Sequence, residues 1–196
     1  MADVKITIIV ENRSGRADLG AEHGWSVLVE TGGVTGLFDT GASDLVARNA
    51  ARLGVDLSAL SWVALSHGHY DHAGGLGAVL DAANGVDVYA HPEAFLPKHV
   101  YETDGTWRYA GMALSREDVE ARGGRVHLAA GPVELPGGAT LTGEVPRETD
   151  YETVPARFQV DRDGERVRDS FPDDQALVMR TDTGLVVLLG ARMRVR

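Results

Sequence analysis

The sequence of 196 residues contains no cysteine, which excludes disulfide bonds and thiolate metal ligands. Any bound metal ion must therefore be held by imidazole nitrogen and carboxylate oxygen. Long apolar runs are also absent: none approaches the roughly 20 residues that a membrane-spanning helix needs. The first residues, Met1 to Lys5, lack the basic and apolar regions of a secretory signal. We therefore expect a cytoplasmic protein with no membrane partner.

Positive charge is in deficit, since 19 Lys and Arg residues face 29 Asp and Glu residues, for a formal net charge of -10. Such a chain repels the phosphates of nucleic acids, so a small-molecule substrate is the expected partner and a nucleic acid is not. The length suits one compact domain, residues 1–196. A count of 24 glycines favours many tight turns between short strands.

Hydrophobic periodicity predicts a layered α/β (α+β) domain. Three strands that form an antiparallel meander come first, strands and helices then alternate, and a hairpin closes the sequence. The expected strands cover residues 5–10, 25–30, 34–38, 62–65, 86–90, 125–128, 140–141, 176–180 and 185–189. Helices are expected over residues 43–53, over residues 73–83, and from a cap at Ser115 to a stop at Gly123 and Gly124.

Histidine and aspartate are concentrated in the segment 66–72 (SHGHYDH), which directly follows the predicted strand 62–65. In an extended chain His67 and His69 point the same way and Asp71 can follow, whereas His72 faces elsewhere. If the chain turns into a helix there, Asp71 and His72 could instead meet a second ion about 3.5–4 Å from the first. Isolated surface histidines in a polar loop are the alternative, but three of the 7 histidines within one short segment favour a metal site. The ligands suit zinc, which we favour, as well as iron or manganese.

The segment 67–72 resembles the HxHxDH signature of the metallo-β-lactamase fold superfamily. The resemblance implies an αββα sandwich and a metal-dependent hydrolase that acts through activated water, with two divalent metal ions, most simply zinc. It also implies that His67 and His69 bind the first ion, and that Asp71 and His72 bind the second ion and act as catalytic residues. Asp39 would then support the metal loop, residues 66–72, without contacting an ion.

Segments 65–76, 90–95, 142–147 and 173–177 resemble the branch of dihydropterin ribofuranosyl-aminobenzene phosphate synthase-like proteins. This similarity implies a small anionic or pterin-linked substrate, with His91 and Arg147 as candidate substrate-binding residues. Lys98 could also pair with an anionic group, although a solvated surface charge is its simpler role. His23 could line the cleft from the opening hairpin.

The same branch continues beyond the strand 184–190 with a further metal-ligating histidine, whereas no histidine lies beyond His127 here. We therefore expect a C-terminally shortened domain in which the second half of the sandwich is incomplete. Asp174, or its neighbour Asp173, is a candidate to support the metal loop or to substitute for a missing ligand. An acidic turn exposed to solvent is the simpler interpretation of both residues.

Two alternatives follow from the same residues. The chain could be a non-catalytic or impaired metal-binding remnant of such an enzyme, and its exposed sheet edges would then favour a homo-oligomer. The segment 38–43 (FDTGAS) also resembles the active-site turn of homodimeric aspartic proteases, with Asp39 as the catalytic residue. That interpretation leaves the histidine cluster unexplained, and the helices predicted for this chain do not suit a small all-β protease.

Overall fold

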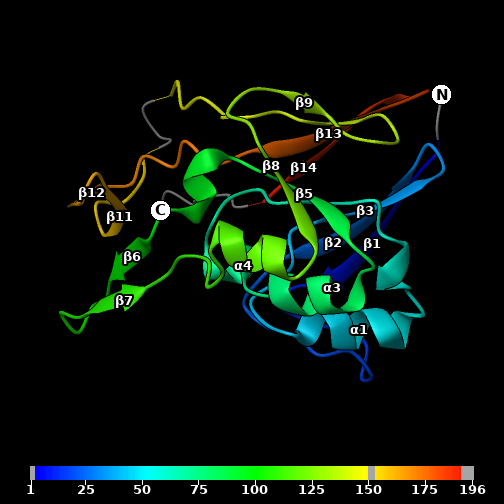
Figure 1. Ribbon diagram of the computed structural model, residues 1–196, viewed down its shortest axis with the longest axis horizontal. Coiled ribbons are helices and arrows are strands. Elements are labelled where there is room, and N and C mark those ends of the chain that lie inside the picture. The colour runs from blue at the N-terminus through cyan, green and yellow to red at the C-terminus, as the bar shows by residue number, and fades with distance from the viewer. Residues whose placement is uncertain (1–2, 150–152, 191–196) are drawn as a thin grey trace.

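Two β-sheets that pack face to face, with helices on the outer side of one of them, form the body of the molecule (Figure 1). The structure is a computed structural model that describes residues 3–149 and 153–190. A third sheet, with four strands like the second, lies to one side of the first two (Figure 1). The arrangement gives successive layers of helix, sheet and sheet, as expected for a metallo-β-lactamase-like sandwich (Figure 1).

The larger sheet has the strand order β1-β2-β3-β4-β5-β8. Its first three strands form the predicted antiparallel meander, and β3, β4, β5 and β8 run parallel. The turn between β2 and β3 consists of Gly32 and Gly33, whose φ values of 57° and 76° suit glycine. The strands are β1 (Val4–Val10), β2 (Ser26–Thr31), β3 (Val34–Phe38), β4 (Trp62–Ala64), β5 (Val86–Ala90) and β8 (Gly124–Leu128).

Helices α1 (Leu45–Leu53), α3 (Leu76–Ala82) and α4 (Arg116–Ala121) cover the outer face of this sheet through one hydrophobic cluster (Figure 1). The predicted cap at Ser115 is confirmed, and it forms a capping box with Asp118 at the start of α4. The remaining short elements are η1 (Leu57–Ala59), α2 (Tyr70–Ala73) and η2 (Pro92–Phe95).

The helix predicted over residues 73–83 is present as α3, but it begins only at Leu76, because Gly74 and Gly75 separate it from α2. Both glycines lie against neighbouring backbone, and a Cβ atom at Gly75 would overlap the carbonyl oxygen of Thr40. The break lets the chain leave the histidine segment in a new direction before α3 begins.

The second sheet has the order β14-β13-β10-β9, and it includes the predicted C-terminal hairpin. Its strands are β9 (Val133–Glu134), β10 (Ala139–Leu141), β13 (Ala176–Thr181) and β14 (Gly184–Leu189). The core between the two sheets combines Phe38 and Trp62 of the first sheet with Leu141, Leu177 and Met179 of the second. Alternate side chains of the edge strand β14 stay largely exposed.

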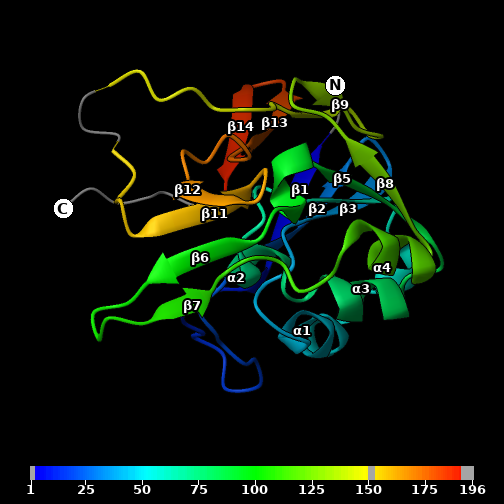
Figure 2. The same ribbon diagram turned by 60° about the vertical axis from the view of Figure 1, so that its left-hand side comes forward.

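The third sheet, in the order β12-β11-β6-β7, was not predicted from the sequence. Its strands are β6 (Lys98–Tyr101), β7 (Trp107–Tyr109), β11 (Phe158–Arg162) and β12 (Glu165–Arg168). It lies beside α2, where His69 forms an isolated bridge with Gly111 (Figure 2). The sheet therefore forms one wall around the histidine segment.

Candidate metal centre

The centre of the site lies where β3 and β4 end side by side. Because parallel strands end at the same edge of a sheet, Asp39 after β3 is brought next to Ser66 after β4. The Asp39 backbone N–H donates to the Ala64 carbonyl at 2.9 Å, which extends the parallel pairing to the last residues before the loop. A buried strand thus delivers the histidine segment to an edge lined by polar groups.

The three histidines of the segment lie together and are buried. The ring centroids of His67 and His72 are 4.3 Å apart, and those of His67 and His69 are 4.9 Å apart. The chain is not extended through this segment: it turns into α2 after His69, and the turn returns His72 to the cluster. Asp71 stands at the margin, with its Oδ2 atom 3.6 Å from Nε2 of His72. The structure therefore has the helical-turn arrangement given as the alternative.

Asp39 anchors this cluster from behind with a fully buried carboxylate. Its Oδ1 atom accepts from the Ser66 N–H at 2.7 Å, and its Oδ2 atom accepts from the Ser66 hydroxyl and from Nδ1 of His72, each at 2.7 Å. Since a carboxylate only accepts, His72 carries its proton on Nδ1 and presents Nε2 to the outside. The neighbouring Thr40 donates from both its N–H and its hydroxyl to the His72 carbonyl. These contacts match the position that the family resemblance implies for Asp39.

Burial and neighbouring charge set different protonation states within the cluster. Burial, reinforced by the adjacent histidines, lowers the pKa of His67 well below its usual value, and burial lowers the pKa of His69 to about 4. Burial also opposes charge on His72, but the charge and hydrogen bond of Asp39 outweigh it and raise the pKa of that ring. His67 and His69 are therefore neutral at pH 7, which is the form that binds a metal ion.

A buried ion cluster connects the histidine segment with the third sheet. Lys98 is fully buried, and its Nζ atom lies 2.9 Å from Asp169 and 3.1 Å from Asp173. Asp173 in turn accepts from the Gly68 N–H at 2.9 Å, between two of the histidines. The interpretation of Lys98 as a solvated charge is thus wrong, and so is that of Asp173 as an exposed acidic turn, since both residues hold the metal loop in place.

Arg147 and Asp174 form an ion pair near the histidines. Arg147 donates to the carbonyls of Ser170 and Phe171 and, at 3.0 Å, to the Asp174 carboxylate. Burial raises the pKa of Asp174 to about 6 although Arg147 opposes that shift. Asp173 accepts the hydrogen bond from the histidine segment, whereas Asp174 is paired with Arg147.

Phe171 covers the inner histidines, with its ring centroid 5.0 Å from that of His69 and 6.3 Å from that of His67. Its φ of 58° is unfavourable for a bulky residue, and the hydrogen bond from its N–H to Asp169 at 2.7 Å helps to hold it. Sequence reasoning missed Phe171, Asp169 and Ser66. Ser66 belongs to the segment 66–72 but was given no role there, whereas the other two reach the site through folding of distant segments.

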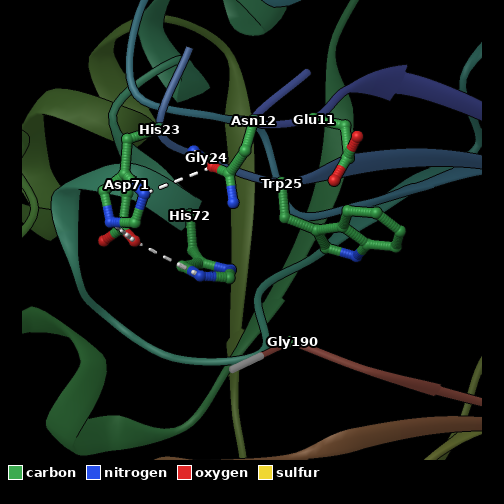
Figure 3. Close-up of a pocket in the computed structure, with 8 residues that line it drawn as sticks. All are labelled: Glu11, Asn12, His23, Gly24, Trp25, Asp71, His72 and Gly190. Atoms are coloured by element: carbon green, nitrogen blue, oxygen red, sulfur yellow. Dashed lines mark hydrogen bonds and ion pairs between the residues drawn. The ribbon is translucent and has the colours of Figure 1, made fainter. Parts of the chain in front are cut away.

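The remaining candidate histidines occupy different places. His91 is buried and caps η2, where its Nδ1 atom accepts from the Glu93 N–H at 3.1 Å. His23 lies on the rim of a small open cleft of about 130 Å³ next to the histidine cluster (Figure 3). The cleft is lined by Glu11, Asn12, His23, Gly24, Trp25, Asp71, His72 and Gly190. The structure therefore brings His23 to the site and gives His91 a capping contact.

The chemistry of the donor set fits a divalent cation. Three imidazoles and one carboxylate supply nitrogen and oxygen ligands, two of the rings are held neutral, and Asp39 fixes the third with Nε2 outward. In residues 3–149 and 153–190, however, no three or more His, Asp or Glu side chains are already arranged so that they could hold a metal ion. Metal binding therefore requires adjustment of these side chains.

Asp39 is not placed as the catalytic residue of an aspartic protease. Both of its oxygens are used by Ser66 and His72 inside the fold, and it is fully buried. Helices also cover one sheet, which does not fit a small all-β protease.

The chain belongs to the metallo-beta-lactamase superfamily, which residues 19–168 match. The fold and the buried histidine segment after β4 agree with that membership. None of the helices in the described part of the chain has the length and apolar character that a membrane crossing requires.

Three proteins show similarity to this chain in sequence or in structure. An uncharacterised protein of Methanocaldococcus jannaschii is 33% identical over 177 residues, covering 89% of this chain and 66% of that protein. The 7,8-dihydropterin-6-methyl-4-(beta-D-ribofuranosyl)-aminobenzene-5'-phosphate synthase of the same organism is 29% identical over 201 residues, covering 96% of this chain and 67% of the synthase. The crystal structure of Tm1679, described as a metal-dependent hydrolase of the beta-lactamase superfamily, matches with 35% identity and a TM-score of 0.78, covering 95% of this chain and 65% of that one. This chain thus spans about two thirds of the length of these relatives.

Proposed function

We propose that this chain is a metal-dependent hydrolase that acts on a small anionic substrate at the histidine cluster. The observation that carries the proposal is the burial of His69 and His72 with their ring centroids each within 5 Å of that of the buried His67, beside Asp71 at the edge where β3 and β4 end. Imidazole rings have little reason to be buried together in this way without a metal ion, because their burial sacrifices hydration. The similarity to Tm1679 supports the same class of activity.

The proposed roles follow from the positions of the side chains. His67 and His69 would hold one divalent cation, and Asp71 and His72 a second, with zinc preferred over iron or manganese. When bound, such ions polarise a carbonyl or phosphoryl oxygen and lower the pKa of water. Asp39 keeps Nε2 of His72 directed away from the core. Asp71, on the edge of the cleft, is the carboxylate best placed to accept a proton from the attacking water.

The substrate is proposed to be anionic and, by similarity to the dihydropterin-linked synthase, pterin-linked. That relative is named as a synthase, so the similarity supports the kind of substrate more than the reaction. Arg147 is the cation nearest to the cover formed by Phe171, with its guanidinium 5.6 Å from the ring centroid. Arg147 and His91 are the proposed contacts for the substrate.

One observation favours the alternative, a non-catalytic metal-binding remnant. The described residues hold no group of three or more ligands that is ready for a metal ion. Most catalytic zinc ions have three protein ligands, so a site with only two would bind weakly. The two functions differ in turnover, which can be measured directly.

The test is hydrolysis of a panel of aryl phosphate esters and lactones by protein that has been freed of metal with a chelator and then reloaded with zinc. We expect zinc-dependent turnover that His69→Ala lowers at least about 100-fold, as expected when a ligand is removed. His127→Ala is the matched control, because His127 lies on β8 in a surface pair with Asp87. Zinc binding without turnover of any substrate would establish the remnant instead.

A further inference from the structure

The cleft beside the histidine cluster contains a third potential ligand that belongs to neither family motif. His23 comes from the loop between β1 and β2, roughly 45 positions before the histidine segment, and it lies beside Asp71 in the lining of the cleft (Figure 3). We propose that His23 is a protein ligand, together with Asp71 and His72, for a divalent cation bound in this cleft. The inference rests on the proposed function and specifies the second cation position.

Two interatomic distances support this ligand set. Nε2 of His23 lies 3.3 Å from Oδ2 of Asp71, and Nε2 of His72 lies 3.6 Å from the same oxygen. Ligand atoms that are each about 2.0–2.1 Å from a tetrahedral zinc ion lie about 3.3–3.4 Å apart. The Asp71 oxygen is thus already near a ligand-to-ligand distance from both imidazoles. The His23 side chain is 71% exposed, so its ring can rotate to complete the set at little energetic cost.

The two histidines are also oriented in the same way. Nδ1 of His72 is fixed by the carboxylate of Asp39, and Nδ1 of His23 lies 3.2 Å from the side-chain oxygen of Asn12. In both rings the Nδ1 atom is held by a protein oxygen and Nε2 is directed to Asp71. Metal-binding histidines in proteins are generally held in this manner, because the second hydrogen bond fixes the tautomer and the ring plane.

The loop that carries His23 is joined tightly to the metal loop. The Trp25 N–H donates to the Asp71 carbonyl at 3.1 Å. Gly24 allows this approach, because a Cβ atom there would lie 2.7 Å from the same carbonyl oxygen. The backbone therefore places His23 beside Asp71 even though its side chain is exposed.

Charge in the cleft favours a cation. The charged residues that line it are Glu11 and Asp71, and no lysine or arginine is among the described lining residues. Asp71 and His72 alone would give a cation two protein ligands, and His23 raises the number to the three that catalytic zinc usually has. This third ligand comes from the loop between β1 and β2, and this sequence has no histidine beyond His127 that could take its place.

The experiment measures zinc affinity by competition with a chromophoric chelator in wild-type protein, His23→Gln and His127→Gln. His127 is the matched control because it is also a substantially exposed histidine paired with an aspartate, with Nε2 2.8 Å from Asp87. We expect His23→Gln to weaken the second zinc equivalent at least about 10-fold. We expect His127→Gln to bind zinc as the wild type does. Thermal unfolding of the metal-free proteins should coincide, since His23 contributes nothing to the core.

A spectroscopic measurement identifies the ligand directly. In protein labelled with ¹⁵N-histidine, zinc should shift the Nε2 resonance of His23, which is assigned by its absence from His23→Gln. Zinc affinities unchanged in His23→Gln, with no shift of that resonance, would overturn the inference and leave the proposed function standing. A wild-type protein that binds no zinc would overturn both.

Discussion

Replacing Asp39 by asparagine removes the negative charge on which the site is built while keeping the shape of the side chain. Asparagine also tolerates the positive φ of 59° at this position, so the substitution tests the hydrogen bonds and not the backbone. The amide oxygen can still accept from the Ser66 N–H. The amide nitrogen, however, faces the Nδ1–H of His72, where two donors now meet.

The cost can be built up from these contacts. Loss of one hydrogen bond to a charged group costs about 1.5–3 kcal/mol, and a buried donor left without an acceptor costs about 1–3 kcal/mol. We therefore expect the free energy of unfolding of Asp39→Asn to fall by about 3–5 kcal/mol. For a domain of this size the melting temperature should fall by roughly 6–20 °C.

Urea denaturation of the metal-free protein, followed by tryptophan fluorescence, measures this change. Asp87→Asn is the control, because Asp87 pairs with Arg125 and His127 on the surface and its loss should cost about 1 kcal/mol or less. If Asp39→Asn were destabilised no more than Asp87→Asn, Asp39 would not anchor the cluster, and the reasoning would be refuted.

Three further predictions concern stability and association. Burial raises the folded-state pKa of Asp174 from 3.8 to about 6, so the free energy of unfolding of the wild type should fall by up to about 3 kcal/mol between pH 4 and pH 6. Asp174→Asn should abolish that fall in urea titrations, and the same pH dependence in wild type and variant would contradict the prediction. Lys98→Met leaves two buried carboxylates without their cation and should lower the free energy of unfolding by about 3–5 kcal/mol in the same assay. Lys5→Met, at an exposed ion pair, should lower it by about 1 kcal/mol or less, and equal losses in the two variants would contradict the prediction. Among the described strands, β14 forms an edge of its sheet and should promote self-association, so Val187→Lys should lower the mass measured by light scattering at high concentration. A wild-type monomer at all concentrations would contradict this prediction.

Strong local signals account for the parts of the fold that were predicted from the sequence. The β-branched runs of β1 to β3, the glycine turn between β2 and β3, and the closing hairpin all specify structure within a few neighbouring residues. The third sheet carries one such signal, the Asp163-Gly164 turn with positive φ at both residues between β11 and β12, which was overlooked in the sequence. Its strands are short and rich in charge, and β6 finds its partner β11 only after a long stretch of chain. Contacts of that range are set by tertiary packing, which local patterns do not record.

The site divides in the same way. The histidine segment was recognisable because its candidate ligands are adjacent in sequence, and the position of Asp39 followed from a neighbouring strand end. The burial of Lys98 between Asp169 and Asp173 was not predictable, because each charge alone resembles a surface residue. Phe171 was missed for a related reason, since an aromatic residue with positive φ leaves no mark in the sequence.

The central claim is that the buried histidine cluster binds divalent metal ions. Elemental analysis of the purified protein, with His69→Ala as the control, tests it most directly. We expect about two ions per wild-type chain, as in two-metal hydrolases, and a clear loss in the variant. A wild-type protein that carries no metal after incubation with excess zinc, and that is indistinguishable from His69→Ala, would contradict the claim.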